Sequence, residues 1–367
     1  MKLFIPLVFT LFFVSCFSPP ERKSNKAVFL SDISWTEAQK ILTPDAVIVI
    51  PLGAAAKEHG PPLPLAADFI QAEGLAEMIA KERKVIIAPT VSYGYYPAFV
   101  KYPGSTTTYW TTSRDMVLQI VRTLAGFGPR RFYIINIGVS TTPVLASAAA
   151  VLKDEGIVLY YSDYDRANYE STENGIRTSI YGGHADEMES SNILFFRGDM
   201  VDMSKAANDS SVKGKSGPMT PVPLHGGTYN PTGINGYAKL ASKQKGVLYA
   251  KAFAKELLKD IDSVAGCSLP VAKNRKEEYK VYEGIYTASN GRKLTIGEEG
   301  NQLSFIWNGI DQRNFFPLYN DGDDFFSAVP FNILFVRDSR GTVIKARCNY
   351  RGEVFWVEKD YVTPIAR

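Results

Sequence analysis

This sequence lacks an excess of charge of either sign, and it lacks the GxSxG motif of serine hydrolases. Its 41 Lys and Arg residues are balanced by 38 Asp and Glu residues, and the basic clusters at 21–26 and 273–280 are short and mixed. No nucleic-acid groove is therefore implied. Without a GxSxG elbow, and without a histidine in a matching context, a Ser-His-Asp triad is not indicated either.

Cysteine and histidine are both scarce, with three of each in 367 residues. Cys267 and Cys348 can form a single disulfide if they lie outside the cytoplasm, although nothing in the sequence shows that they pair. Apolar residues are abundant, because 45% of the chain is hydrophobic and 12% is aromatic. That composition is enough to bury a large core and favours two domains over a disordered or fibrous chain.

The N-terminus carries a short apolar run. Lys2 is followed by LFIPLVFTLFFV at 3–14, which is too short to cross a bilayer and is followed by Ser15 and Cys16. This pattern is typical of a secretory signal. The sequence FVSC at 13–16 also resembles the lipobox of bacterial lipoproteins, in which the cysteine becomes the lipidated first residue.

These features predict an exported protein, either a bacterial membrane-anchored lipoprotein held by a lipid on Cys16 or a periplasmic protein. The signal peptide is expected over 1–16 and a polar, proline-containing tether over 17–27. A plain cleaved signal and an uncleaved anchor are the alternatives to lipidation.

Short β-branched runs alternate with helical stretches through most of the chain. The strand-like runs are 46–51, 85–89, 131–136 and 157–161. Strands about 40 residues apart, with helices between them, indicate a three-layer α/β/α domain with a mostly parallel sheet. A long helix is expected over 238–261 at the end of this domain, which we assign to residues 28–265.

The pattern of apolar and polar residues changes after residue 265. Periodicity is lost over 266–278, as in a linker, and short alternating stretches separated by tight turns follow from 279 to 363. This pattern predicts a small antiparallel β domain, a barrel or a sandwich. We interpret it as an accessory module.

The loop after the first predicted strand contains KEHGPPLPLAAD at 57–68. Histidine and carboxylates are usual ligands of zinc and of harder hydrolytic metals. The turn at His59, followed nine residues later by Asp68 at a helix start, can bring both side chains to one ion. A turn with a hydrogen-bonded imidazole explains the same residues, so the motif alone leaves both interpretations open.

Four stretches together resemble the creatininase family (creatinine amidohydrolase and its relatives). They are PLGAAAKEHGPPLPLAAD at 51–68, YG and YPGSTT within 93–107, FYIINIGVST at 132–141 and GHADEMESS at 183–191. Their order along the chain is that of the family. The resemblance implies the family's α/β fold and hydrolysis of a carbon–nitrogen bond in a small-molecule amide.

The resemblance also implies roles for particular residues. His59 corresponds to a metal ligand, and Asp68 to the carboxylate that bridges two metal ions, which together activate a water for attack on an amide. His184 matches a histidine that faces the substrate and takes part in proton transfer to the leaving nitrogen. Glu187 and Glu189 match the acids that follow it, and these three residues are predicted to be catalytic.

Three departures from the family pattern reduce the number of metal ions that the site is expected to bind. Lys57 stands where the family has its first ligand acid, Pro62 replaces a second histidine, and the loop 136–141 contains neither histidine nor carboxylate. Two ions need about five or six protein ligands, so one ion is expected rather than two. Alternatively, the Lys57 ammonium takes the place of a missing metal and pairs with Asp68.

The predicted ligands of the single ion are Glu58, His59 and Asp68, which would leave an open position for water. The cofactor is a divalent metal ion, with zinc as the first choice and manganese or iron as alternatives. If the residues around His184 are helical, His184 and Glu187 share a helix face and Glu189 points elsewhere. A favourable helix start explains the same residues without catalysis.

Tyr93, Tyr96 and Ser140 are predicted to bind the substrate. The two tyrosines belong to an aromatic cluster after the second strand, which suits either a pocket wall or ordinary packing. The Ser140 hydroxyl can contact a substrate, although polar turn chemistry explains it equally well.

Two functions from different classes therefore follow from the sequence. One is a metal-dependent hydrolase of small amides, and the other is a catalytically inactive lipoprotein of the same fold that binds a ligand or has a structural role. Since creatininases commonly form symmetric oligomers, the resemblance also implies a homo-oligomer.

Overall fold

The computed structural model describes residues 26–163, 167–211, 218–225, 227–299, 302–307, 316–322, 324–328, 331–350 and 352–360. By their contacts the residues form two compact units. Within the described residues, the first runs to Ser113 and includes Thr123–Leu145 and Leu159–Cys267, and the second consists of Arg114–Arg122, Ala146–Val158 and the residues from Ser268 onward. The predicted signal peptide, with Cys16, lies outside the described residues.

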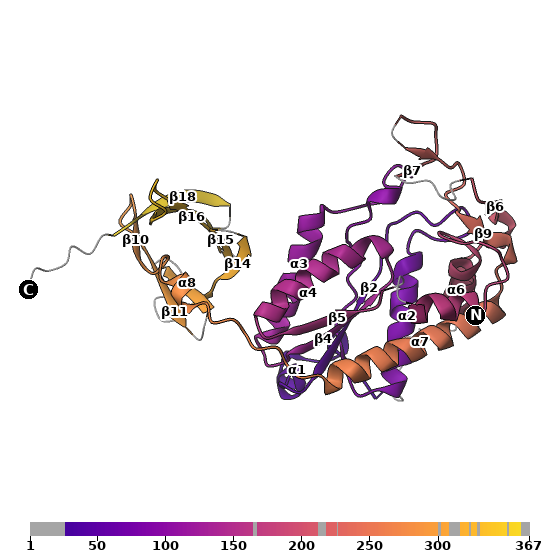
Figure 1. Ribbon diagram of the computed structural model, residues 1–367, viewed down its shortest axis with the longest axis horizontal. Helices are drawn as coiled ribbons and strands as arrows, with labels where there is room; N and C mark the ends of the chain where they lie inside the picture. Colours follow the sequence, from indigo (N-terminus) through magenta and orange to yellow (C-terminus); the bar gives the residue numbers. More distant parts are fainter. Residues whose placement is uncertain are drawn as a thin grey trace, which may run out of the picture. The chain divides into compact units, whose positions relative to one another are not determined.

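A five-stranded sheet is the central element of the α/β part of the chain (Figure 1). Its strands are β1 (Val28–Phe29), β2 (Val47–Leu52), β3 (Ile86–Ile87), β4 (Arg131–Asn136) and β5 (Val158–Tyr161). Their order is β1-β3-β2-β4-β5, and the pairs β1–β3, β3–β2 and β2–β4 are parallel. All six residues of β2 are buried, as expected for a parallel strand covered on both faces.

Three helices pack on one another beside this sheet. They are α2 (Ala67–Glu82), α6 (Glu187–Arg197) and α7 (Lys243–Gly266), and α2 and α7 also contact β2 and β4. The α6 and α7 backbones approach closely at Gly246, where an added Cβ would lie 1.9 Å from the carbonyl oxygen of Ser191. A glycine is therefore needed at this crossing.

The other helices and two small β-ribbons also precede the C-terminal sheet in the chain. The other helices are α1 (Trp35–Ile41), α3 (Trp110–Ala125), α4 (Thr142–Asp154), α5 (Ala167–Asn174) and α8 (Lys276–Tyr279). Two small ribbons pair β6 (Asn208–Asp209) with β9 (Gly236–Tyr237), and β7 (Met219–Thr220) with β8 (Thr228–Tyr229). None of the helices in the described ranges is long and apolar enough to cross a membrane.

The C-terminal residues form a nine-stranded antiparallel sheet. Its strands are β10 (Gly284–Ala288), β11 (Lys293–Glu299), β12 (Gln302–Trp307), β13 (Phe316–Pro317), β14 (Tyr319–Gly322), β15 (Phe325–Ala328), β16 (Phe331–Arg337), β17 (Val343–Tyr350) and β18 (Glu353–Lys359). The strand order is β13-β12-β11-β10-β18-β17-β16-β15-β14, so the first and last strands of the domain pair with each other. Its core is aromatic, with Tyr286, Trp307 and Phe331 nearly or fully buried.

The predicted fold class is confirmed, because a largely parallel sheet with helices is followed by a separate antiparallel β domain. The helix predicted over 238–261 begins later, at Lys243, because the Ser242 side chain accepts a hydrogen bond from the Lys245 backbone N–H and caps it. Cys267 and Cys348 are free thiols, and Cys348 is fully buried. Burial raises the pKa of the Cys348 thiol to about 12.

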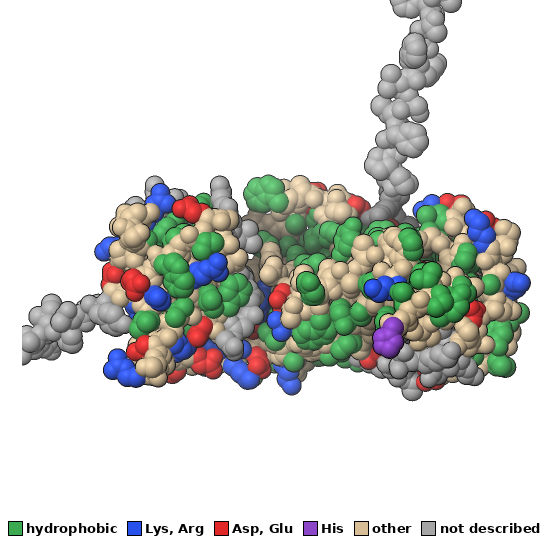
Figure 2. Space-filling view, turned by 90° about the horizontal axis from the view of Figure 1, so that it is seen from above, with side chains coloured by type: hydrophobic (Ala, Val, Ile, Leu, Met, Phe, Trp, Pro, Cys, Tyr) green, Lys and Arg blue, Asp and Glu red, His purple; other side chains and the backbone are tan. Residues whose placement is uncertain are grey.

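Charged side chains of both signs are interspersed on the molecular face shown in Figure 2, in agreement with the balanced composition. Apolar side chains are also visible there. Large apolar side chains of the first unit with more than half of their surface exposed include Tyr93, Tyr109 and Ile180.

Candidate functional site

The loop between β2 and α2 carries two of the predicted site residues, Glu58 and His59, and is held by hydrogen bonds of its backbone. The Lys57 N–H donates to the Leu65 carbonyl at 3.0 Å, and the Glu58 N–H donates to the Ser105 hydroxyl at 3.0 Å. Gly53 packs directly on the start of α2, since an added Cβ would lie 2.3 Å from the Asp68 carbonyl oxygen. This contact brings Asp68, in the first turn of α2, next to the loop.

Lys57, His59 and Asp68 form a buried charged cluster. Asp68 is completely buried, His59 is 1% exposed and Lys57 is 6% exposed. Lys57 Nζ lies 2.7 Å from Asp68 Oδ2, as an ion pair without a well-aligned hydrogen bond, and His59 Nε2 lies 2.7 Å from Asp68 Oδ1. The sequence left open whether Lys57 pairs with Asp68, and the structure shows that it does.

The hydrogen-bond partners of His59 require a proton on each ring nitrogen. Nδ1 faces the Lys57 carbonyl at 2.9 Å and Nε2 faces the Asp68 carboxylate, and both of these groups are acceptors. Burial alone would lower the pKa of His59, but the Asp68 carboxylate outweighs it and the pKa is raised. Burial would likewise raise the pKa of Asp68, but the Lys57 ammonium and His59 hold it well below its ordinary value.

His184 and Glu189 reach the same place from a different part of the chain. The His184 backbone forms a β-bridge with Asn235, and Ala185, at φ 48°, turns the chain toward α6 in a conformation that non-glycine residues rarely adopt. Asp186 caps α6 by accepting hydrogen bonds from the Met188 and Glu189 backbone N–H groups. This entry aims the Glu189 carboxylate at His184 Nδ1, 3.6 Å away.

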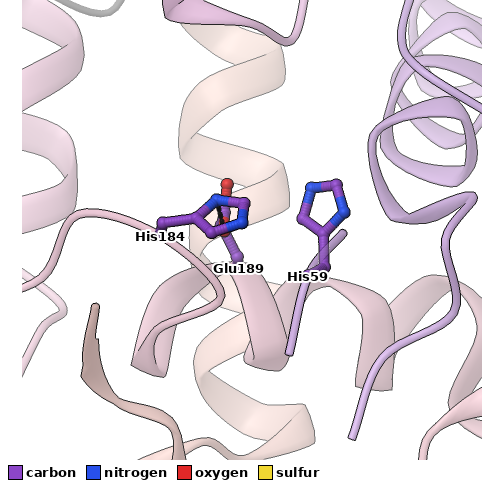
Figure 3. Close-up of side chains that lie close together, drawn as sticks. All are labelled: His59, His184 and Glu189. Atoms are coloured by element: carbon purple, nitrogen blue, oxygen red, sulfur yellow. Dashed lines mark ion pairs between the residues drawn. The ribbon is translucent and has the colours of Figure 1, made fainter. Parts of the chain in front are cut away.

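The two histidine rings face each other, with a centroid separation of 4.9 Å (Figure 3). Among the described residues, His59, His184 and Glu189 form a group whose potential ligand atoms all lie within 4.8 Å of one another. Glu58 adds a second acid, because its Oε2 lies 3.1 Å from His184 Nε2. Two imidazoles and a carboxylate are a common ligand set of catalytic zinc.

These residues fit one divalent ion better than two. The carboxylates of Glu58, Asp68 and Glu189, with the single Lys57 ammonium, carry a net charge of −2 when both histidines are neutral, as metal ligands must be. One divalent cation would balance that charge. Among the described residues no second group of potential ligands is found, and Lys57 already occupies one oxygen of Asp68.

A cavity of about 530 Å³ opens next to this cluster. Lys57, His184 and Glu189 line it, together with Gln71, Phe99 and Ser140. Arg177 also lines it and is ion-paired with Asp186 at 2.8 Å. The cavity therefore combines charged groups with the aromatic side chains of Phe99 and Tyr249, as small-molecule sites commonly do.

The predicted ligand set of Glu58, His59 and Asp68 does not converge on one point. Both oxygens of Asp68 face cationic or donor groups, and the Glu58 carboxylate turns to the Gly60 N–H and to His184. The structure instead brings His59 together with His184 and Glu189. The separation of 125 residues between His59 and His184 explains why spacing alone could not show this grouping.

The expected pairing of His184 with Glu187 is wrong, and so is the expectation that Glu189 points elsewhere. His184 precedes α6 rather than belonging to it, so helical spacing does not apply. Glu187 is fully buried and accepts hydrogen bonds from Thr178, Ser179 and Lys245, with Lys245 Nζ at 2.6 Å. Its carboxylate stabilises the segment before α6 and does not line the cavity.

The three predicted substrate-binding residues are placed differently from one another. Ser140 lines the cavity, and its hydroxyl donates to the Tyr95 carbonyl at 2.9 Å. Tyr96 is buried beneath the Lys57 ammonium, 5.8 Å from its ring centroid, and does not line the cavity. Tyr93 is 56% exposed and also lies outside the lining. Gln71 and Arg177 were not singled out in the sequence, where no motif marks them.

The comparisons with known proteins concern the family and the fold of the chain. The sequence profile of the Creatininase family, described as creatinine amidohydrolase, matches residues 31–261. Creatinine amidohydrolase of Pseudomonas putida is 26% identical over 118 residues, which cover 30% of this chain and 45% of that protein. The chain thus matches less than half the length of this curated relative.

Solved structures share the fold. A creatinine amidohydrolase (creatininase) structure has a TM-score of 0.57 at 20% identity, over 66% of this chain and 99% of its own. A putative creatinine amidohydrolase from Bacteroides fragilis has a TM-score of 0.53 at 21% identity, over 66% and 98%. Since the family profile covers more than half of the residues, the chain belongs to the creatininase family.

Proposed function

We propose that this protein is a metal-dependent hydrolase of a carbon–nitrogen bond in a small amide, and that it uses one divalent ion. The observation that carries the proposal is the convergence of His59, His184 and Glu189 beside the cavity. Solved creatininases include a Zn–Zn form and a manganese form, so zinc is the first choice and manganese the alternative.

Each residue of the cluster has a defined part in this proposal. His59, His184 and Glu189 would hold the ion, which supplies a Lewis acid for the amide carbonyl and a means of activating water. The His59 ring faces Asp68 through Nε2 and the Lys57 carbonyl through Nδ1, so the ion would replace one of these contacts and the other would orient the ring. Glu58, 3.1 Å from His184 Nε2, would accept the hydrogen bond of that nitrogen and orient the ring.

The proposal requires that metal binding displaces protons. Both ring nitrogens of His59 face acceptors in the metal-free arrangement, so the ion has to replace a proton there. Affinity should therefore increase with pH.

We expect about one equivalent of zinc or manganese in the purified chain by elemental analysis, and proton release when the metal-free chain is reloaded. The His59→Ala and Glu189→Gln variants should hold no metal, whereas His225→Ala, which changes an exposed histidine, should hold as much as the unaltered chain. A folded chain that takes up no divalent ion at any pH from 6 to 9 would contradict the proposal.

A second candidate is a binding protein without catalysis, favoured by the buried ion pair of Lys57 and Asp68. The ammonium supplies a positive charge that needs no metal, and the cavity then serves only to hold a ligand. Absence of metal from the folded chain, with retained ligand binding, would support this candidate.

We also propose that the chain is exported and anchored through a lipid on Cys16, on the basis of the sequence at 13–16. Cells fed labelled palmitate should produce a labelled chain, and the Cys16→Ser variant should be unlabelled. The Cys267→Ser variant serves as the control and should keep the label. An unlabelled native chain would refute the lipid anchor.

A further inference from the structure

We propose that Lys57 and Gln71 form a subsite in the cavity that binds an sp² oxygen of the ligand, either a carboxylate oxygen or an amide carbonyl oxygen. The subsite deepens the proposed function, since it lies in the same cavity, and it requires no metal. It predicts that the ligand is an acyl compound that presents such an oxygen to two N–H donors.

The first observation concerns Gln71, which is 2% exposed and lines the cavity from α2. Its Oε1 accepts a hydrogen bond of 2.8 Å from Asn192 Nδ2 on α6, and this bond holds the Gln71 side chain against α6. Within the described residues its Nε2 has no hydrogen-bond partner. A buried amide nitrogen without an acceptor destabilises the protein, and an oxygen in the cavity would supply that acceptor.

The second observation concerns Lys57, which lines the same cavity and is nearly as well buried as Gln71. An ammonium has three N–H donors, and the Asp68 carboxylate behind it faces one side. Phe99 lies 5.2 Å from Nζ and offers no hydrogen-bond acceptor other than the face of its ring. Apart from Asp68, no strong acceptor for the Lys57 ammonium is found among the described side chains.

The rest of the lining determines the kind of ligand. Ile137, Gly138 and Val139 give a neutral wall, and Phe99 gives an aromatic one. Arg177 cannot compete strongly for the ligand oxygen, because its guanidinium is already paired with Asp186 and Glu173. A small acyl group therefore fits, with its oxygen on Lys57 and Gln71 and its apolar part toward Phe99.

Acetate and acetamide are suitable probes, because they have the same shape and differ in charge and in the second acceptor. Binding is measured by calorimetry on the full chain treated with a chelator, so that no metal contributes. We expect millimolar binding of acetate, and weaker binding of acetamide, because a charged acceptor forms a stronger hydrogen bond with an ammonium. Tighter binding of acetamide would assign the subsite to an amide oxygen and would equally support the proposal.

Gln71→Glu is the decisive variant, since it keeps the size of the side chain and replaces the N–H donors by an acceptor. It should weaken acetate binding at least about tenfold, and Lys57→Met should do the same. Lys101→Met, which removes an exposed ammonium, should bind acetate as the unaltered chain does. Should Lys57→Met fail to fold, as shown by near-ultraviolet circular dichroism, Gln71→Glu still decides the question.

Equal binding of acetate to the unaltered chain and to Gln71→Glu would overturn the proposal, as would no binding of either probe up to about 100 mM. These results are independent of the metal experiment. A chain that binds acetate but no metal refutes the metal centre alone, whereas a chain that binds metal but neither probe refutes the oxygen subsite alone.

Discussion

The Asp68→Ala variant is expected to lose about 3–5 kcal/mol of unfolding free energy at pH 7. The substitution leaves the Lys57 ammonium and the His59 ring buried without the carboxylate that lies 2.7 Å from each. Breaking a buried pair costs more than the pair contributes, because the remaining charge stays away from water. Urea denaturation, followed by circular dichroism, measures this loss.

The matched control is Asp262→Ala, which breaks the pair with Arg83 at a distance of 2.8 Å. Both of its side chains are more than a third exposed, and such pairs contribute about 0.2–1 kcal/mol. The double variant Lys57→Met with Asp68→Ala should recover part of the loss, since it removes the stranded ammonium. A loss below about 1 kcal/mol for Asp68→Ala would show that the ion pair does not form.

The second large effect concerns acid sensitivity at Glu187. Burial alone would raise the pKa of Glu187, but hydrogen bonds from Lys245, Ser179 and Thr178 lower it to about 2. A lowered pKa in the folded state stabilises the fold above the unfolded pKa of about 4.3, and the gain is lost as the pH falls toward 2. We expect Glu187→Gln to cost about 3 kcal/mol at pH 7 and little near pH 2.

Urea denaturation of the unaltered chain and of the Glu187→Gln variant, each at pH 7 and at pH 3, tests this expectation. The cost of Glu187→Gln should shrink between the two values, whereas Glu277→Gln, whose carboxylate is 81% exposed, should have little effect at either pH. If Glu187→Gln were equally stable at pH 7 but inactive in hydrolysis, the carboxylate would be catalytic after all, and its structural role would be refuted.

The sequence predicts the fold well where the information is local. The run at 46–51 becomes β2 at Val47–Leu52, because consecutive β-branched residues suit a strand buried on both faces. Asp68 begins a helix as expected, in the first turn of α2. The family resemblance also selected the loop at 57–68 and the segment at 183–191, which do form the site.

The details of the site depend on contacts that no local pattern encodes. Whether Glu187 or Glu189 reaches His184 is decided by where α6 begins, and a change of one or two residues in that start redirects both side chains. The position of His184 depends on a bridge to Asn235, 51 residues later. Gln71 is one polar residue in an ordinary helix until Asn192 and the cavity are placed beside it.

The pairing of the first and last strands of the β domain has a mechanical consequence. Tyr286 on β10 lies opposite Lys359 on β18, and the Asp360 N–H donates to the Ile285 carbonyl, so the chain enters and leaves the domain at the same end of two neighbouring strands. A force applied between residues 280 and 360 would pull β10 and β18 apart from one end. Their hydrogen bonds would then break one after another instead of all together. The domain should therefore unzip under a low force when it is pulled at its two ends, even though its aromatic core is well buried.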